Sequence, residues 1–291
     1  MAGQAKILVV NADDFGLSQG INRGILSAHQ NGILRSTSIM PNGSAFEDAV
    51  RIARETPELG VGIHLSLIGE KSVSPAGELR GMVNDEGLLP DSYPAFTRQL
   101  LSKRFNAGHV RTEIRAQIEL VLTAGIDPTH IDSHQHLHML PAVFDIVLDV
   151  AREYAIPVVR IPLHRGGGTG RGGTIARLVQ ALILPRIDRS RLRQVEAAGL
   201  RTADWFWGLE VSGKMDEASL MATLQSLGLG VNEVMCHPGI SDAATAERYQ
   251  WGYSWDDGLA ALQSDAVRRF VDDNDIRLAS FKDAWDESLS P

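Results

Sequence analysis

The stretch KILVVNADDFG, residues 6–16, joins a short apolar run to the polar residues that directly follow it. The run Ile7–Val10 predicts a buried strand, and Asn11, Asp13 and Asp14 come where that strand ends. The same order recurs along the chain, with a helical pattern after each apolar run. Further strands are expected at Ser36–Met40, Val61–Leu65, Thr129–Asp132, Val158–Arg160, Thr202–Trp205, Val231–Cys236 and Arg277–Ala279. Strands that alternate with helices in this number predict parallel βα units closing into a (β/α)-barrel, with residues 1–291 as one α/β domain.

Helical periodicity lies between the predicted strands. The first helix is expected to begin after Ser18, a suitable N-cap, and to end at Asn31–Gly32, a suitable stop. The expected helices are Gln19–Gln30, Ala45–Arg54, Arg111–Thr123, Ala142–Tyr154, Asp216–Leu227 and Gly258–Asp273.

Two stretches interrupt this alternation. Residues 69–95 are rich in Gly, Pro and Ser and predict a long loop after the third strand. Residues 164–173, HRGGGTGRGG, follow the fifth strand and predict a flexible glycine-rich loop. A phosphate-binding loop is the weaker interpretation, because neither a Walker spacing nor a dinucleotide fingerprint is present.

Composition and charge exclude several classes of protein. The net charge is −8 and the Lys and Arg residues are scattered, so a nucleic acid is not expected as a partner. The single cysteine, Cys236, excludes an internal disulfide and suits a reducing compartment. The apolar run near the N-terminus is too short for a signal peptide, and no later stretch has the length of a membrane span. We therefore expect a cytoplasmic protein without a transmembrane segment.

Polar residues that can bind metals or substrates gather at the predicted strand ends. In barrels of this kind the carboxyl ends of the strands meet at one rim, where catalytic groups converge. In addition to the three polar residues after the first strand, these positions hold Asn42, His64, Asp132, His134, Arg160, Asp204 and His237. Their number predicts an active site at that rim.

Asp13 and Asp14 bring two carboxylates together after an apolar strand. Such a pair is costly unless a cation or a proton separates the charges. Adjacent residues leave a strand in different directions, so one carboxylate can bind a metal while the other faces a substrate. On the pair alone, an Asx turn leading into Gly16 is an equal alternative. His64, taken by itself, is more often a buried core histidine than a ligand.

The segment THIDSHQHLHMLP, residues 129–141, carries four of the nine histidines of the chain. Neutral imidazole is a common metal ligand, and a carboxylate such as Asp132 can orient the ring or bind the ion itself. A surface cluster without a role is the alternative, but the apolar frame and Pro141 favour a strand-end metal site. His134, His136 and His138 cannot all bind one ion, so some of them must face the substrate or support the ligands.

His237 follows the predicted strand Val231–Cys236 and precedes a proline. It is well placed to act as a general acid, and a loop cap is its alternative role. Cys236 should point to the opposite face, which predicts core packing. The chain has no Gly-x-Ser-x-Gly motif, which argues against a serine hydrolase.

Four motifs, NADDFGLS, GIHL, HIDSHQHLH and VMCHPG, together resemble the YdjC-like carbohydrate deacetylase family and occur in its order. The resemblance implies a distorted (β/α)-barrel related to polysaccharide deacetylases, with one divalent metal ion. It implies Asp13 as the general base, His237 as the general acid and Asp132 as a catalytic carboxylate or a support for the ligands. The implied metal ligands are Asp14, His64 and His134. The residues expected to contact the substrate are Asn42, His136, His138, Arg160 and Trp205.

A narrower resemblance concerns residues 203–215, ADWFWGLEVSGKM, which look like the hopanoid-biosynthesis-associated branch of the family. That branch implies an N-acetylglucosaminyl hopanoid lipid as substrate and transient contact with a membrane surface, whereas the wider family implies a chitooligosaccharide. Trp205 and Trp207 are expected to stack on a sugar or line an apolar groove, and Phe206 to belong to the core. A homodimer remains open.

These features predict a metal-dependent hydrolase that removes an N-acetyl group from an N-acetylglucosamine-containing substrate. Two imidazoles and a carboxylate suit Zn, Co or Mn, and the family resemblance also allows Mg. One alternative is a metal-dependent phosphoesterase or amidohydrolase on a similar barrel. The step from His134 to His136 suits an amidohydrolase, although that motif belongs at the first strand, where this chain has Asp13 and Asp14. The other alternative is a non-enzymatic carbohydrate- or lipid-binding protein.

Overall fold

The computed structural model describes residues 5–102, 106–162 and 184–286, and a seven-stranded parallel sheet forms its centre. Strand β1 (Lys6–Phe15) lies in the middle and pairs with both β2 and β6. The order across the sheet is β4-β3-β2-β1-β6-β5, and β7 pairs with the first residues of β1. The other strands are β2 (Ser36–Ile39), β3 (Gly60–Leu65), β4 (Ile131–Ser133), β5 (Trp205–Trp207), β6 (Gly230–Cys236) and β7 (Arg277–Leu278).

The sheet curls until its two outer strands approach each other. Isolated bridges pair Ile131 of β4 with Val159, and Val158 with Arg201, which precedes β5. The expected strand at Val158–Arg160 is wrong in extent, because it makes only these bridges between Pro157 and Pro162, neither of which can donate a ladder hydrogen bond. The α/β class and the distorted barrel are confirmed.

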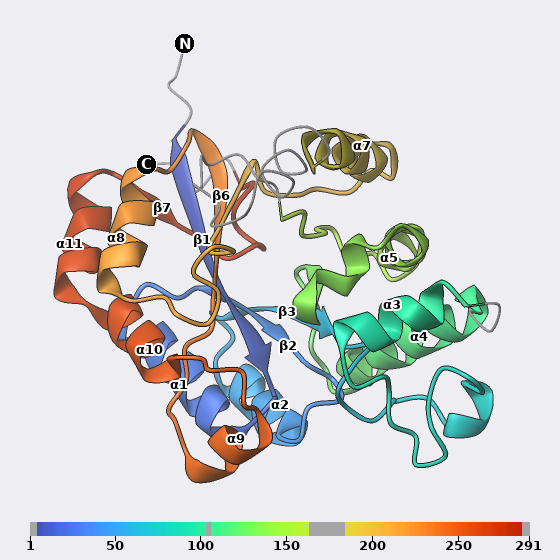
Figure 1. Cartoon of the computed structure of the whole chain (residues 1–291). Coiled ribbons are helices and arrows are strands. Elements are labelled where there is room, and N and C mark those ends of the chain that lie inside the picture. The colour runs from blue at the N-terminus through green and yellow to red at the C-terminus, as the bar shows by residue number, and fades with distance from the viewer. Residues whose placement is uncertain (1–4, 103–105, 163–183, 287–291) are drawn as a thin grey trace, which may run out of the picture.

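Helices cover the outside of the sheet in two groups. Figure 1 shows α8, α10 and α11 on one side of β1 and β6, and α3, α4, α5 and α7 on the other. The helices of the first half are α1 (Gln19–Asn31), α2 (Phe46–Glu55), α3 (Tyr93–Leu100), α4 (Ala107–Thr123) and α5 (Pro141–Glu153). Those of the second half are α7 (Leu184–Ala197), α8 (Glu217–Gln225), α9 (Ala243–Arg248), α10 (Trp255–Gln263) and α11 (Asp265–Asp273).

The predicted ends of the first helix are confirmed. The Ser18 hydroxyl accepts a hydrogen bond from the N–H of Ile21, and Gly32 is the C-cap. The single helix expected at Gly258–Asp273 is wrong, because the chain turns at Ser264, whose hydroxyl caps the start of α11. Helices α3, α7 and α9 were not predicted. Among the described residues, no helix combines the length and the apolar character needed to cross a membrane.

The stretch predicted as a loop at 69–95 is mostly irregular, but it holds a 3-10 turn (Ala76–Glu78) and the start of α3. Glu113 of α4 fastens it, because its two carboxylate oxygens accept the N–H groups of Val73 and Ser74 at 2.9 Å each. The glycine-rich stretch 164–173 lies outside the described residues.

The barrel interior changes from apolar to polar along the strands. Side chains alternate across a strand, so Val9 shares its face with the residues two and four positions later. At the amino end, Val9 and Val231 pack with Phe281 in a small apolar cluster. The polar residues further along the same inward faces are Asn11, Asp13, His64 and Glu233, all buried. This change of polarity places the candidate site at the carboxyl end of the sheet.

Strand β1 runs further than the predicted Ile7–Val10. Asn11 and Ala12 continue the pairing with both neighbouring strands, and the register shifts only between Ala12 and Phe15. The first polar residues therefore lie inside the strand, between two neighbours that hold their backbone in place.

Candidate functional site

A buried arginine joins three carboxylates inside the barrel. Nη1 and Nη2 of Arg160 donate to Oδ2 and Oδ1 of Asp13 at 2.8 and 2.7 Å, a bidentate arrangement. Nη2 also lies 2.8 Å from Oδ2 of Asp132, and Nε donates to Oε1 of Glu233 at 2.6 Å. All four side chains are fully or almost fully buried. The guanidinium thus holds Asp13 in one orientation.

The three carboxylates respond differently to this shared cation. Burial by itself raises their pKa values, but at Asp13 and Asp132 the charges of Arg160 and His64, with the hydrogen bonds to these carboxyls, together outweigh burial and hold each pKa below its ordinary value. At Glu233 burial prevails and raises the pKa to about 7. Asp13 is consequently ionised at neutral pH, whereas Glu233 is partly protonated.

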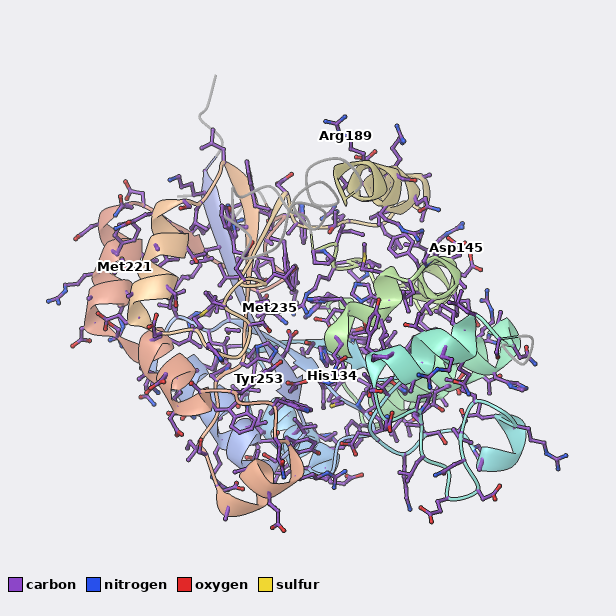
Figure 2. All side chains as sticks on the ribbon, in the orientation of Figure 1. His134, Asp145, Arg189, Met221, Met235 and Tyr253 are labelled. Atoms are coloured by element: carbon purple, nitrogen blue, oxygen red, sulfur yellow. The ribbon has the colours of Figure 1, made fainter. Side chains whose placement is uncertain are left out.

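Asp14, His64 and His134 point their donor atoms at one position. Oδ1 of Asp14 lies 3.3 Å from Nε2 of His64 and 3.1 Å from Nδ1 of His134. Ligand atoms each about 2.1 Å from one ion lie roughly 3.0–3.4 Å from one another. The three side chains are buried, and Figure 2 shows His134 in the middle of the molecule. The donor set and its spacing fit a divalent metal ion.

A second group of possible ligands, formed by Asp13, His64 and Asp132, overlaps the first. Its two carboxylates already have the Arg160 guanidinium as a cation between them, so an ion there would meet a positive charge. Asp14, by contrast, keeps a buried Oδ2 that accepts no hydrogen bond from the described residues. The first group is therefore the better metal site.

Asp132 orients His64 from behind. Its Oδ1 lies 2.7 Å from Nδ1 of His64, which leaves Nε2 directed at Asp14. A carboxylate on the far nitrogen commonly fixes the tautomer of a metal-binding imidazole. Burial lowers the pKa of His64, but Asp132 and Asp13 outweigh it and raise the pKa to about 10.

The backbone next to two of these ligands is strained. Asp14 has a φ of 68°, and Gln135 and His136, directly after His134, have φ values of 53° and 54°. Residues with a Cβ seldom adopt the left-handed region, and such strain gathers at functional sites. At Asp14 it separates the two adjacent carboxylates, so that Asp13 faces Arg160 and Asp14 faces the histidines.

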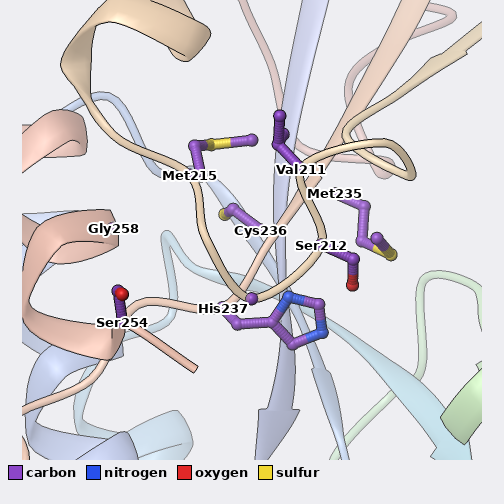
Figure 3. Close-up of a pocket in the computed structure, with 9 residues that line it drawn as sticks. Val211, Ser212, Met215, Met235, Cys236, His237, Ser254 and Gly258 are labelled. Atoms are coloured by element: carbon purple, nitrogen blue, oxygen red, sulfur yellow. The ribbon is translucent and has the colours of Figure 1, made fainter. Parts of the chain in front are cut away.

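His237 lies directly after β6 and next to Asp14. Its Nε2 lies 4.0 Å from Oδ2 of Asp14, and its ring contacts Tyr253 edge to face at 4.9 Å. Burial lowers the pKa of His237 below its ordinary value. Figure 3 shows the Cys236 side chain directed away from the His237 ring, and the thiol donates to the carbonyl of Asn11 at 3.4 Å. Cys236 accordingly belongs to the core.

The structure places Trp205, which was expected to contact the substrate, away from the other candidate residues. It begins β5 at the amino end, where its Nε1 donates to the carbonyl of Leu229. Alternation along the strand turns Phe206 inward instead, with its ring 5.8 Å from that of His136. The guanidinium carbon of Arg160 lies 5.6 Å from the same ring.

Two further residues expected to contact the substrate are enclosed by protein. The nitrogens of His138 engage the Ser133 hydroxyl at 2.6 Å and the carbonyl of Arg160 at 2.9 Å. The Arg160 side chain is itself buried against the carboxylates. Both side chains are therefore packed against other described residues, and a contact with the substrate stays a prediction for them as well. Asn42 and His136 are only partly buried, and their role stays a prediction.

Sequence reasoning missed Glu233 and the aromatic residues that follow α9. The signal for Glu233 was a carboxylate in a buried strand whose only other polar side chain is that of Asn232. The signal for the second group was an aromatic residue at every second position in YQWGYSW, residues 249–255.

The model of the family described as YdjC-like protein matches residues 7–273. The chain belongs to the YdjC-like family. A relative from Clostridium beijerinckii, named carbohydrate deacetylase, is 31% identical over 278 residues, which cover 95% of this chain and 99% of that protein. A relative from Klebsiella pneumoniae, named chitooligosaccharide deacetylase, is 32% identical over 279 residues, with 96% and 99% of the two chains covered.

A crystal structure of an Enterococcus faecalis protein is also similar to this YdjC-like chain. It has a TM-score of 0.78 and 26% identity, with 99% of this chain and 100% of that chain covered. That protein has been assigned provisionally to cellobiose-phosphate cleavage. The similarity therefore extends over the full length of both chains.

Proposed function

We propose that this YdjC-like protein is a metal-dependent hydrolase that removes the N-acetyl group from N-acetylglucosamine-containing carbohydrates. One observation carries the proposal: the donor atoms of Asp14, His64 and His134 converge beside Asp13, a buried and ionised carboxylate. The relatives named carbohydrate deacetylase and chitooligosaccharide deacetylase support the reaction and the substrate class.

The three donors would hold a divalent ion of Zn, Co, Mn or Mg, which supplies Lewis-acid activation of the acetyl carbonyl and of a water. Asp13 takes the proton of that water as its oxygen adds to the amide carbon. Arg160 keeps Asp13 ionised and directed inward for this step. Asp132 keeps the Nε2 of His64 available.

His237 supplies the second proton transfer. An amide nitrogen leaves poorly unless it is protonated, and His237 lies near Oδ2 of Asp14, whereas the other two histidines lie near Oδ1. Its lowered pKa makes the protonated ring a stronger acid toward the departing nitrogen. When the C–N bond breaks, the products are acetate and a free amino sugar.

The test is acetate release from N,N′-diacetylchitobiose and from an N-acetylglucosaminyl lipid, measured in parallel with Zn, Co, Mn and Mg. Acetate from the lipid alone would support the narrower assignment to an N-acetylglucosaminyl hopanoid. Asp13→Asn should keep the metal and lose at least about 100-fold in turnover. Asp127→Asn, on an exposed carboxylate, is the matched control and should retain activity.

Near-normal deacetylation by Asp13→Asn at saturating metal would refute the assignment of the base. Phosphate release from a generic phosphoester, without acetate release, would favour the phosphoesterase alternative. Sugar binding with no acetate from any substrate would favour a carbohydrate-binding protein.

A further inference from the structure

Four aromatic side chains alternate along the segment between α9 and the start of α10. Successive ring centroids of Tyr249, Trp251, Tyr253 and Trp255 lie 4.9, 5.4 and 5.9 Å apart. We call these four residues the aromatic ladder. The backbone between Tyr253 and Trp255 is held in place, because the N–H of Ser254 donates to the carbonyl of Gly213 at 2.7 Å. The aromatic ladder therefore forms a continuous wall of rings.

The aromatic ladder passes directly beside the candidate metal site. The Trp251 ring lies 5.1 Å from that of His134, and the Tyr253 ring lies 4.9 Å from that of His237. Figure 2 shows His134 and Tyr253 together in the middle of the molecule. One wall thus links a candidate metal ligand to the candidate general acid.

Trp251 also lines a cavity of about 190 Å³ that reaches His134. Its polar lining comes from Glu70, Asp91, Gln135 and Arg248. An aromatic face with polar groups around it suits a pyranose ring, which has an apolar C–H face and hydroxyl groups at its edge.

The charges of this cavity favour an uncharged sugar. Glu70 is buried, forms an ion pair with the half-exposed Arg248, and accepts the hydroxyl of Tyr249 at 2.9 Å. The positive charge of Arg248 is therefore balanced by Glu70, and Asp91 adds a negative charge to the lining of the cavity. A phosphorylated sugar would meet no excess of positive charge here.

We propose that this cavity is the subsite for the uncharged pyranose ring next to the scissile amide, with the ring stacked on Trp251. The proposal rests on the proposed deacetylase function and adds the residues that select its substrate. Asp91, Gln135 and Arg248 supply hydrogen-bond acceptors and donors to the hydroxyl groups, and Glu70 holds Arg248 and Tyr249 in place.

The test is calorimetric binding of N,N′-diacetylchitobiose to the metal-loaded protein, with metal content measured on each sample. Trp251→Leu should weaken binding about 10-fold, which corresponds to about 1.4 kcal/mol, with the metal retained. Trp251→Phe should keep most of the affinity because it retains an aromatic face. Trp205→Leu, an indole at the opposite end of the barrel, is the matched control and should bind as the wild type does.

Unchanged binding by Trp251→Leu would overturn the proposal. So would loss of metal together with loss of sugar in both Trp251 variants, since Trp251 would then only support His134. Tighter binding of N-acetylglucosamine 6-phosphate than of N-acetylglucosamine, abolished by Arg248→Gln, would overturn the assignment to an uncharged ring.

Failure of the subsite and failure of the deacetylase have different signatures. Sugar binding that depends on Trp251, without acetate release, would leave the subsite standing and refute the deacetylase. Equal acetate release from N-acetylethanolamine and from the disaccharide, without measurable sugar affinity, would refute the subsite and leave the deacetylase standing.

Discussion

Glu233→Gln replaces the buried carboxylate that binds Nε of Arg160 with a neutral group of nearly the same shape. Burial raises the pKa of Glu233 from 4.5 to about 7, so folding takes up a proton here between these pH values. The stability from the protonated carboxyl is full below pH 4.5 and is lost as the pH rises through 7. About 2.5 pH units, at about 1.36 kcal/mol each, correspond to about 3 kcal/mol.

The stability of the variant relative to the wild type should therefore increase as the pH rises. At pH 8 we expect Glu233→Gln to exceed the wild type by up to about 3 kcal/mol, and at pH 4.5 to match it within about 1 kcal/mol, because the amide oxygen can still accept from Arg160. Urea unfolding of metal-free protein, followed by tryptophan fluorescence between pH 4.5 and 8, measures this difference. The other titrating groups are common to both proteins and cancel.

Glu210→Gln, on an exposed carboxylate, is the control and should change stability by less than about 0.5 kcal/mol at any pH. A difference between Glu233→Gln and the wild type that does not vary with pH would refute the reasoning. So would a variant less stable than the wild type at pH 8, since the ionised Glu233 would then be stabilised by Arg160 more than burial penalises it.

Three further predictions concern the surroundings of the site. Asp132→Asn should lower zinc affinity by about 10–100-fold, measured by competition with a chelator, because His64 loses the carboxylate that orients it; unchanged affinity would argue against that role. Gly62→Ala should cost about 1–3 kcal/mol in urea unfolding, since its Cβ would lie 2.3 Å from the His130 ring, whereas Gly77→Ala has open space and should be nearly neutral. Burial lowers the pKa of His130 to about 4, so the unfolded chain binds the extra proton and this side chain costs the folded state up to about 3 kcal/mol as the pH falls from 6.5 toward 4. His130→Asn should therefore gain stability relative to the wild type over this range, and a difference that does not vary with pH would contradict the assignment.

Much of the fold could be predicted because apolar period and cap residues act locally. Ser18 and Gly32 bound α1 as expected, and the ends of β2 and β3 lie within a residue of their predicted positions. The misses depend on tertiary contacts. Asn11 continues β1 because two neighbouring strands pair with it. A prediction from the apolar pattern alone ends the strand at the residue before Asn11, the first polar residue.

The candidate site likewise combines features that could be predicted from the local sequence with features that depend on tertiary contacts. Residue type and strand position drew attention to Asp14, His64 and His134, and the family resemblance singled them out as ligands; the structure brings the three together. The role of each buried charged side chain, however, depends on partners that lie far away in the sequence. Arg160 serves Asp13 across 147 residues, so its role as a partner of the carboxylates could not be inferred from local pattern. Trp205 was misplaced because a tryptophan in a strand indicates neither the end of the barrel nor the face.

The most direct test of the account is metal stoichiometry across the two overlapping ligand groups. Zinc bound per chain, measured by elemental analysis after dialysis, should be about one for the wild type and for Asp13→Asn. It should fall toward zero for Asp14→Asn and for His134→Ala. Full zinc content in Asp14→Asn and His134→Ala, with loss in Asp13→Asn, would contradict the account and move the ion to the group that contains Asp13 and Asp132.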